Sequence, residues 1–167
     1  MEKKLMILAI FCLFSVMVAP ASAFTAESLL INVSENGDAM VTFSYSLGWA
    51  EKIAVFFKIA DPATELKHAL ESNSGKEVSV HELTPNSASF LIHGYAQINT
   101  GDGEVTYTTP ALSFARAAAI LSGYWFAPLI SVDFSPEETT VIFPDRYVEN
   151  FKDKIEIPSV SHTLSIF

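Results

Sequence analysis

Cysteine is almost absent from this chain. Its 167 residues contain one cysteine, Cys12, which lies inside an apolar run near the N-terminus. Downstream of that run the sequence allows no disulfide, thiolate metal site, iron–sulfur cluster or cysteine nucleophile. A fold without such links must be stabilised by its apolar core, and an apolar content of 50% is enough to build one.

Basic residues are also scarce. Ten lysines and arginines are outnumbered by nineteen aspartates and glutamates, so the formal net charge is −9. Nucleic acids and anionic membrane surfaces attract basic patches, so neither is an expected partner. We interpret the acidic surface as a source of solubility.

Several catalytic motifs are missing as well. The chain has no G-x-S-x-G nucleophile elbow, no phosphate-binding glycine loop, no dinucleotide fingerprint and no EF-hand loop. His81-Glu82 begins like a zinc-protease motif, but no second histidine follows one helical turn later. The sequence therefore predicts no cofactor, no metal site and no catalytic residue, and we expect a protein that is not an enzyme.

Residues 1–23 have the pattern of a secretory signal peptide. Lys3 and Lys4 precede an apolar run over 5–18, and an Ala-Ser-Ala cleavage pattern follows. The apolar run is too short for a comfortable membrane span. We expect cleavage before Phe24, which leaves a secreted, extracellular or cell-surface protein without a stable membrane anchor. Small secreted animal domains usually carry disulfides, so the missing cysteines then favour a prokaryotic source.

Residues 24–167 are expected to form a single globular α+β domain, because no linker, repeat or low-complexity run divides them. Period-two patterns predict an antiparallel sheet of about five to seven strands. We expect three to four helices packed mainly on one face of that sheet. Apolar spacings of three and four place these helices over 49–60, 62–73, 110–121 and, more briefly, 145–151.

The hairpin over 28–47 gives the clearest strand signal. Alternate residues are apolar on both sides of Gly37, a residue that suits a left-handed turn position. The resulting register places Ile31 opposite Val41 on one apolar face. Asn32 belongs to the chain's one N-glycosylation sequon and faces outward in this hairpin, so it is a glycosylation candidate.

Further strand pairings follow from the same alternation. Val80 is expected opposite Ile92, and Ile98 opposite Val105, because both choices keep the apolar side chains on one face. The remaining strands are expected over 129–134, 139–143 and 154–157.

Tyr124, Trp125 and Phe126 form the aromatic run that suggests a binding site. Three successive rings cannot all face one core, so at least one is expected at the surface. Exposed rings stack on sugars or anchor protein interfaces, while core packing is the alternative for this run. Trp49 heads the apolar stripe of the first expected helix, where burial is favoured.

Histidines and acids suggest two other kinds of site. His81 and His93 are expected on the same outer face, offset diagonally, and would share a metal only under a different pairing. A hydrolase site assembled from distant residues would use acids such as Asp133, Glu137 or Glu138 with a histidine. Separated, solvated carboxylates would count against that hypothesis.

Two stretches carry a resemblance. The first is the hairpin turn Glu35-Asn36-Gly37-Asp38-Ala39, followed by an expected helix that carries Phe56-Phe57-Lys58-Ile59-Ala60-Asp61-Pro62. The second is Thr139-Thr140-Val141-Ile142-Phe143-Pro144-Asp145. Together they resemble an uncharacterised secreted or surface-exposed domain of archaea, methanogens included. The resemblance implies a location outside the cytoplasm and carries no activity with it.

The leading hypothesis is a secreted or cell-envelope domain that acts by binding or assembling with a protein or envelope component. The second hypothesis is a carbohydrate- or small-ligand-binding module that uses the aromatics at 124–126. The third is the hydrolase described above.

Overall fold

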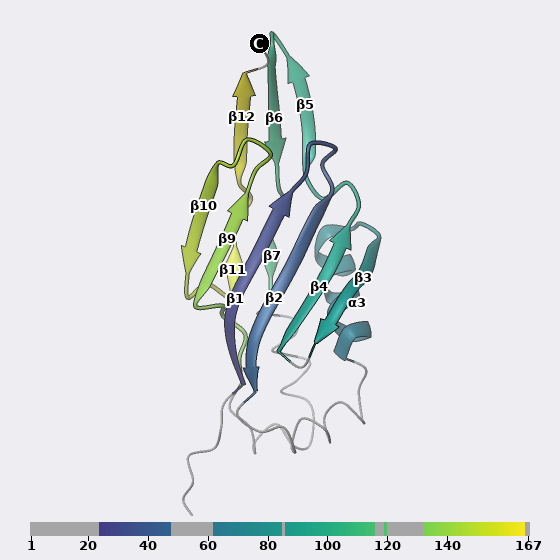
Figure 1. Ribbon diagram of the computed structural model, residues 1–167, viewed down its shortest axis with the longest axis vertical. Coiled ribbons are helices and arrows are strands. Elements are labelled where there is room, and N and C mark those ends of the chain that lie inside the picture. The colour runs from purple at the N-terminus through teal and green to yellow at the C-terminus, as the bar shows by residue number, and fades with distance from the viewer. Residues whose placement is uncertain (1–23, 48–61, 85, 116–118, 120–131, 166–167) are drawn as a thin grey trace, which may run out of the picture.

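The structure is a computed structural model that describes residues 24–47, 62–84, 86–115, 119 and 132–165. This part of the chain is mostly β-sheet, and its strands are divided among three sheets (Figure 1). One helix with described bounds, α3 (Pro62–Ser74), packs beside the edge of the largest sheet.

The main sheet has the strand order β10-β9-β1-β2-β4-β3, with β8 beside the start of β1. Its strands are β1 (Phe24–Val33), β2 (Ala39–Leu47), β3 (Val78–Thr84), β4 (Ser87–Ile92), β8 (Val132–Asp133), β9 (Glu138–Ile142) and β10 (Val148–Lys152).

The small sheet has the order β12-β6-β5 and extends beyond one end of the main sheet (Figure 1). Its strands are β5 (Gln97–Gly101), β6 (Glu104–Thr108) and β12 (Ser161–Ser165). A third pair joins β7 (Leu112–Ser113) to β11 (Glu156–Ile157). This pair and α3 lie behind the main sheet in the view of Figure 1, so one broad face of the sheet has no described element over it.

The predicted hairpin of β1 and β2 is confirmed in register. Ile31 pairs with Val41 and Leu29 pairs with Phe43. All four side chains are buried on the covered face of the main sheet. Fully burying one such side chain is worth about 1.5–3 kcal/mol, so a one-residue slip that turned them all outward would cost many times that value.

The core lies between the main sheet and the elements behind it. Inward side chains alternate along each strand, as a half-covered sheet requires. The largest of these fully buried side chains are Leu29, Ile31, Val33, Val41, Val78, Phe90, Ile92 and Val141, and Phe143 joins them just after β9.

The expected α+β fold with three to four helices is wrong, because the described chain is mostly strand. The helix expected over 62–73 is present as α3. The segment 110–121 begins with β7, and its described helical residues are Ala115 and Ala119, whereas 145–151 forms a turn followed by β10. The helix expected over 49–60 lies outside the described residues.

A tight turn explains why 145–151 is not helical. The amide of Arg146 donates to the Phe143 carbonyl at 2.8 Å, the amide of Phe143 donates to the Tyr147 carbonyl at 2.9 Å, and Arg146 has a φ of 72°. Val148 then points outward and Phe151 inward on a strand paired with β9. A spacing of three residues would place both side chains on one face of a helix, whereas on a strand it places them on opposite faces. Pairing with β9 selected the strand.

The sheet is also not purely antiparallel. β1 pairs in parallel with β9, with Leu29 opposite Thr139, and in parallel with β8. The strand expected over 139–143 is thus present as β9, while only β8 of the segment 129–134 is described as strand. Of the strand expected over 154–157, only β11 forms.

Two predicted registers are wrong by two residues. Val80 pairs with Phe90, and Ile98 pairs with Tyr107. A slip of two residues keeps every side chain on the same face, so alternation alone does not distinguish these registers. A bulge between Val80 and Glu82 contributes to the observed pairing in β3.

The β1–β2 turn depends on Gly37, which has a φ of +82°. A Cβ there would lie 2.8 Å from the Ala96 carbonyl oxygen, whereas one at Gly75, which also has a positive φ, would meet nothing within 4 Å. Both Gly→Ala changes carry left-handed strain, but only the first also displaces backbone. We expect Gly37→Ala to cost roughly 1–2 kcal/mol more than Gly75→Ala in urea unfolding. Equal losses would contradict the close approach.

Thr139 is fully buried, and its Oγ1 has no hydrogen-bond partner among the described residues. A buried hydroxyl without a partner destabilises the folded state. We expect Thr139→Val to raise the free energy of unfolding by about 1 kcal/mol. The matched change Thr140→Val, on the outward side of the same strand, should have little effect. Urea titration measures both variants. A loss of stability in Thr139→Val would contradict the assignment of Oγ1 as a buried hydroxyl without a partner.

Candidate interaction surface

The uncovered side of the main sheet carries two rows of outward side chains, which we call the contact face. The rows cross β10, β9, β1, β2 and β4, and neighbouring members are opposite one another in the strand register. The first row is Val148, Ile142, Asn32, Met40 and Leu91, and the second is Asn150, Thr140, Leu30, Thr42 and Ser89.

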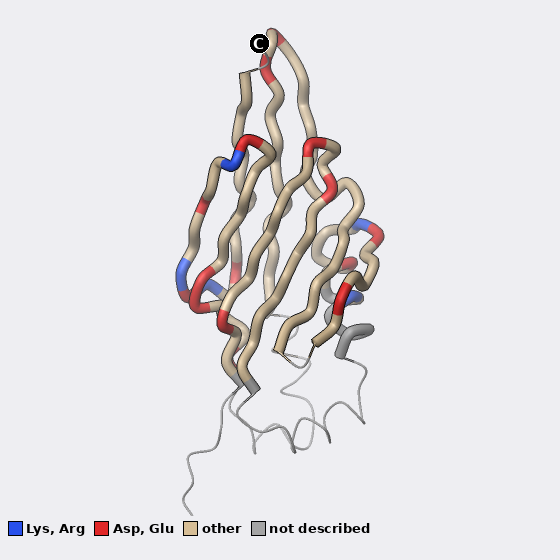
Figure 2. Tube along the Cα trace, viewed as in Figure 1, with Lys and Arg blue, Asp and Glu red and all other residues tan. Residues whose placement is uncertain are grey.

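The contact face contains no charged residue, although the chain has a net charge of −9. In Figure 2 the middle of the main sheet is free of charge, and acidic and basic positions gather in the connecting loops and at the edges. The nearest outward charges are on Lys152 and Glu138 in the next row and on Glu82 of β3. Five strands at the usual spacing make this uncharged area about 19 Å wide.

Each strand of the contact face presents one apolar and one hydrogen-bonding side chain. Leu30 is 38% exposed and Val148 is 44% exposed. Thr42 Oγ1 and Ser89 Oγ share a hydrogen bond of 3.0 Å, which fixes both hydroxyls across β2 and β4. Each strand apart from β10 is paired on both edges, so the surface is rigid and loses little conformational entropy when a partner binds.

Loops at one end of the main sheet hold the small sheet in place. Asp38 accepts the Gly94 amide on Oδ1 at 2.8 Å, and its Oδ2 lies 3.1 Å from His93 Nδ1. The Ala96 amide donates to the Gly37 carbonyl at 2.9 Å. The Gly94 amide, with a further contribution from His93, lowers the pKa of the Asp38 carboxyl below its ordinary value.

The contacts of Asp38 form a first fastening, by which we mean a histidine–aspartate pair that attaches the small sheet. A second fastening joins β12 to the β9–β10 turn. His162 Nε2 donates to Asp145 Oδ2 at 2.8 Å, and Tyr147 stacks on the imidazole with ring centroids 4.0 Å apart. Phe143 lies 5.2 Å away from the same ring. The hydrogen bond from His162 lowers the pKa of Asp145, while the bond from Tyr147 to Glu149 raises the pKa of the phenol.

These two histidine–aspartate pairs are suited to holding the sheets together. Among the described residues, no serine or threonine hydroxyl is hydrogen-bonded to His93 or His162. Aromatic rings and a carboxylate surround His162, which is 18% exposed at its side chain. Both pairs therefore serve as local restraints on the small sheet.

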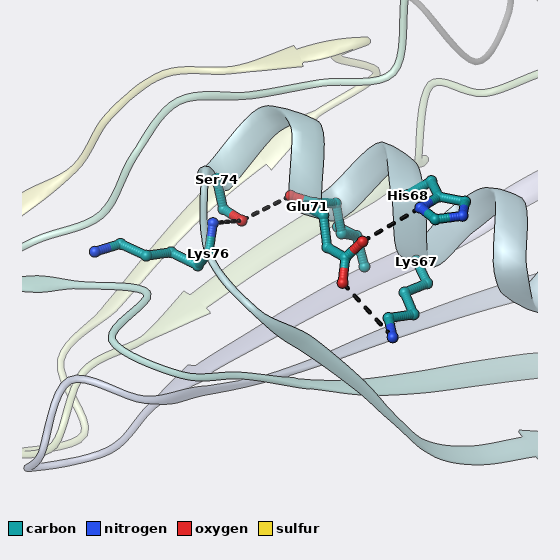
Figure 3. A network of polar contacts seen from close by, with 6 residues as sticks. Lys67, His68, Glu71, Ser74 and Lys76 are labelled. Carbon is teal, nitrogen blue, oxygen red and sulfur yellow. Dashed lines mark hydrogen bonds and ion pairs between the residues drawn. The ribbon is translucent and has the colours of Figure 1, made fainter.

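The structure places the remaining histidines, His68 and His81, on different elements. His81 lies at the bulge in β3, and His93 lies beyond the end of β4 beside Asp38, so the structure does not bring them together. His68 is on α3, where its Nδ1 lies 3.3 Å from Glu71 Oε2 (Figure 3). The other oxygen of Glu71, Oε1, lies 3.6 Å from Lys67 Nζ. Across the described ranges, no group of three or more histidine, cysteine or acidic side chains could hold a metal ion.

The acids of the hydrolase hypothesis are exposed. Asp133 accepts the Ser135 amide at 2.8 Å within a local turn, and Glu137 and Glu138 lie on the surface nearby. Within the described part of the chain, none of the three is hydrogen-bonded to a histidine. They therefore do not form the convergent, buried arrangement that such a site would need.

The other predicted site residues divide into two groups. Tyr124, Trp125, Phe126 and Trp49 lie outside the described residues. Asn32 is exposed on β1, as the hairpin register predicts, and it lies within the contact face.

Sequence reasoning missed the contact face and both aspartates of the fastenings. The contact face is assembled from five strands, so no short motif announces it. The one available signal is the set of uncharged outward positions in the β1–β2 hairpin.

The fastening at Asp38 makes stability depend on pH. Because its pKa is lower in the folded chain than the ordinary value of 3.8, its stabilisation is complete above that value and disappears as the pH falls through the lower folded value. We expect Asp38→Asn to be less stable than the wild type at pH 7, by on the order of 1 kcal/mol. Urea titrations from pH 7 to pH 2 should show the gap closing below pH 3.8.

Glu27→Gln is the matched control, because it removes one exposed charge far from this loop. It should leave stability nearly unchanged at every pH. A gap for Asp38→Asn that persists undiminished to pH 2 would contradict the assignment.

Among the described residues, no helix has the length and apolar content that a membrane span requires. No family model matches the chain, and no curated protein or solved structure matches it. The contact face and the two histidine–aspartate pairs beside the small sheet are therefore the starting points for assigning a function.

Proposed function

We propose that this chain is a non-enzymatic secreted or cell-envelope domain that binds or assembles with a protein partner through the contact face. The observation that supports this proposal is the uncharged area across five strands of a strongly acidic chain. Charged residues are depleted at the centres of protein interfaces and retained at their rims. The contact face has this distribution, with Lys152 and Glu138 beside it.

The shape and chemistry of the face favour a protein partner. It is the uncovered surface of a sheet, whereas sites for small molecules are concave. Leu30 and Val148 present aliphatic groups, and Asn32 and Asn150 present amides for hydrogen bonds. Aliphatic centres with dispersed polar groups are typical of protein contacts.

The proposed location rests on the sequence. The charge, apolar run and small-residue cleavage pattern of residues 1–23 are those of a signal peptide. The structure does not describe this segment. A thiol-free chain after the leader is compatible with an oxidising compartment because it has no cysteine to oxidise.

The test compares two leucines of similar exposure. Leu30→Glu places a charge in the middle of the contact face, and Leu83→Glu places one on β3 outside it, at a position that is 52% exposed. Each variant and the wild type are incubated with the envelope fraction of the source organism, and bound proteins are quantified by mass spectrometry. We expect Leu30→Glu to lose a partner by about tenfold, equivalent to about 1.4 kcal/mol, because a buried charge without a partner disfavours association.

Leu83→Glu should retain the same partner at the wild-type level. Equal thermal unfolding midpoints for the two variants establish that both are folded. Undiminished binding by Leu30→Glu, or equal losses in both variants, would overturn the contact face as the binding surface. Secretion is tested separately by N-terminal sequencing of protein recovered from the medium, which should begin at Phe24.

A further inference from the structure

The small sheet has an open edge at β5. Its strand order is β12-β6-β5, so among the described strands β5 is paired on one side only. All five of its residues, Gln97–Gly101, are exposed. In Figure 1 the other side of this strand faces no described element beyond the β1–β2 turn. An open strand edge presents unpaired backbone groups to a further strand.

The hairpin turn identifies which backbone groups are unpaired. Gly101 lies opposite Glu104 across a two-residue turn, and such a closing pair is hydrogen-bonded on both sides. Hydrogen-bonded pairs recur at every second residue, so Asn99 also bonds across to β6. The amides and carbonyls of Ile98 and Thr100 therefore point away from β6.

Ala96 supports this assignment independently. It precedes Ile98 by two residues and shares its orientation. Its amide donates to the Gly37 carbonyl at 2.9 Å, which lies on the side away from β6. The β1–β2 turn thus already uses the first position of this edge, and the next two positions are open.

The described outer edges of the main sheet carry features that discourage strand addition, and β5 does not. β3 has a bulge and Glu82, and β10 carries Glu149 and Lys152. Bulges, charges and prolines are the usual protection of an edge strand. The sequence of β5, Gln-Ile-Asn-Thr-Gly, contains neither charge nor proline.

We propose that β5 pairs antiparallel with β5 of a second copy of this chain, with Asn99 of each copy directly opposite the other. Ile98 of each copy then lies opposite Thr100 of the other. Each of these two positions exchanges an amide and a carbonyl, which gives four hydrogen bonds across the two-fold axis. The two small sheets become one continuous sheet.

Neighbouring registers are blocked by the structure. A two-fold centre at Ile98 would require the Ala96 amide, which is already bonded to Gly37. A centre at Thr100 would require extended backbone at Asp102, which has a φ of 51° in the hairpin turn. The centre at Asn99 uses the two open positions and requires neither the Ala96 amide nor extended backbone at Asp102.

The side chains in this register are compatible with a second copy. Ile98, which is 37% exposed, packs beside a threonine methyl, and no two like charges are directly opposite. Asp102 of one copy lies toward the turn of the other, which carries Glu35 and Asp38. Their repulsion makes the association weak at low ionic strength and stronger as salt screens it.

The edge of β5 is separate from the contact face on the main sheet. Either surface can fail its test without affecting the other.

The experiment traps the pair with a disulfide. In a Cys12→Ser background, Asn99→Cys places one thiol per chain at a non-hydrogen-bonded pair, where Cα atoms are about 4.5 Å apart and a disulfide can form. The matched control is Asn150→Cys, an exposed residue at the edge strand β10. Under mild oxidation we expect about tenfold more cross-linked dimer from Asn99→Cys, and an increase with added salt.

A second variant tests the backbone bonds themselves. Thr100→Pro in the Asn99→Cys protein removes a donor that β6 does not use, and Thr100→Val keeps that donor. Cross-linking should fall about tenfold with proline and stay unchanged with valine. Equal cross-linking of the two cysteine variants overturns the proposal. So does a Thr100→Pro variant that cross-links like Thr100→Val at an unchanged unfolding midpoint.

Discussion

The two-sided pairing of β1 is the constraint on which the rest of the structure depends. β1 bonds antiparallel to β2 and parallel to β9, while alternate side chains from Leu29 to Val33 enter the core. A strand in this position fixes the register on both of its sides, because a slip of one residue would expose its whole apolar set. The side chains of the outer face follow from the same alternation, which turns Leu30 and Asn32 away from the core.

The small sheet is attached to one end of the rigid main sheet. The turns after β1 and β9 carry Asp38 and Asp145, and each aspartate holds a histidine near or within the small sheet. Both fastenings are partly exposed, so salt and acid weaken them more than they weaken the buried core. The attachment of the small sheet to the main sheet therefore depends in part on salt and pH.

The two proposed surfaces use different physical resources. The contact face offers side chains on a sheet whose backbone groups are already paired, so recognition there depends on shape and uncharged chemistry. The β5 edge offers unpaired backbone groups, so a partner binds there by adding a strand, mainly through main-chain hydrogen bonds. With both proposed surfaces, the domain would bind a partner through the contact face and a second copy through the β5 edge.

The sequence by itself determined the β1–β2 hairpin, helix α3, the outward position of Asn32 and the lack of thiol chemistry, because local periodicity and turn residues specify these features. It did not determine the parallel pairing of β1 with β9, the two-residue register differences at Val80 and Ile98, or the strand at β10. Those depend on segments far apart in the chain, and a two-residue slip leaves the apolar pattern unchanged. The contact face, the aspartate fastenings and the open edge of β5 likewise exist only once distant strands are brought together, so tertiary packing alone decided them.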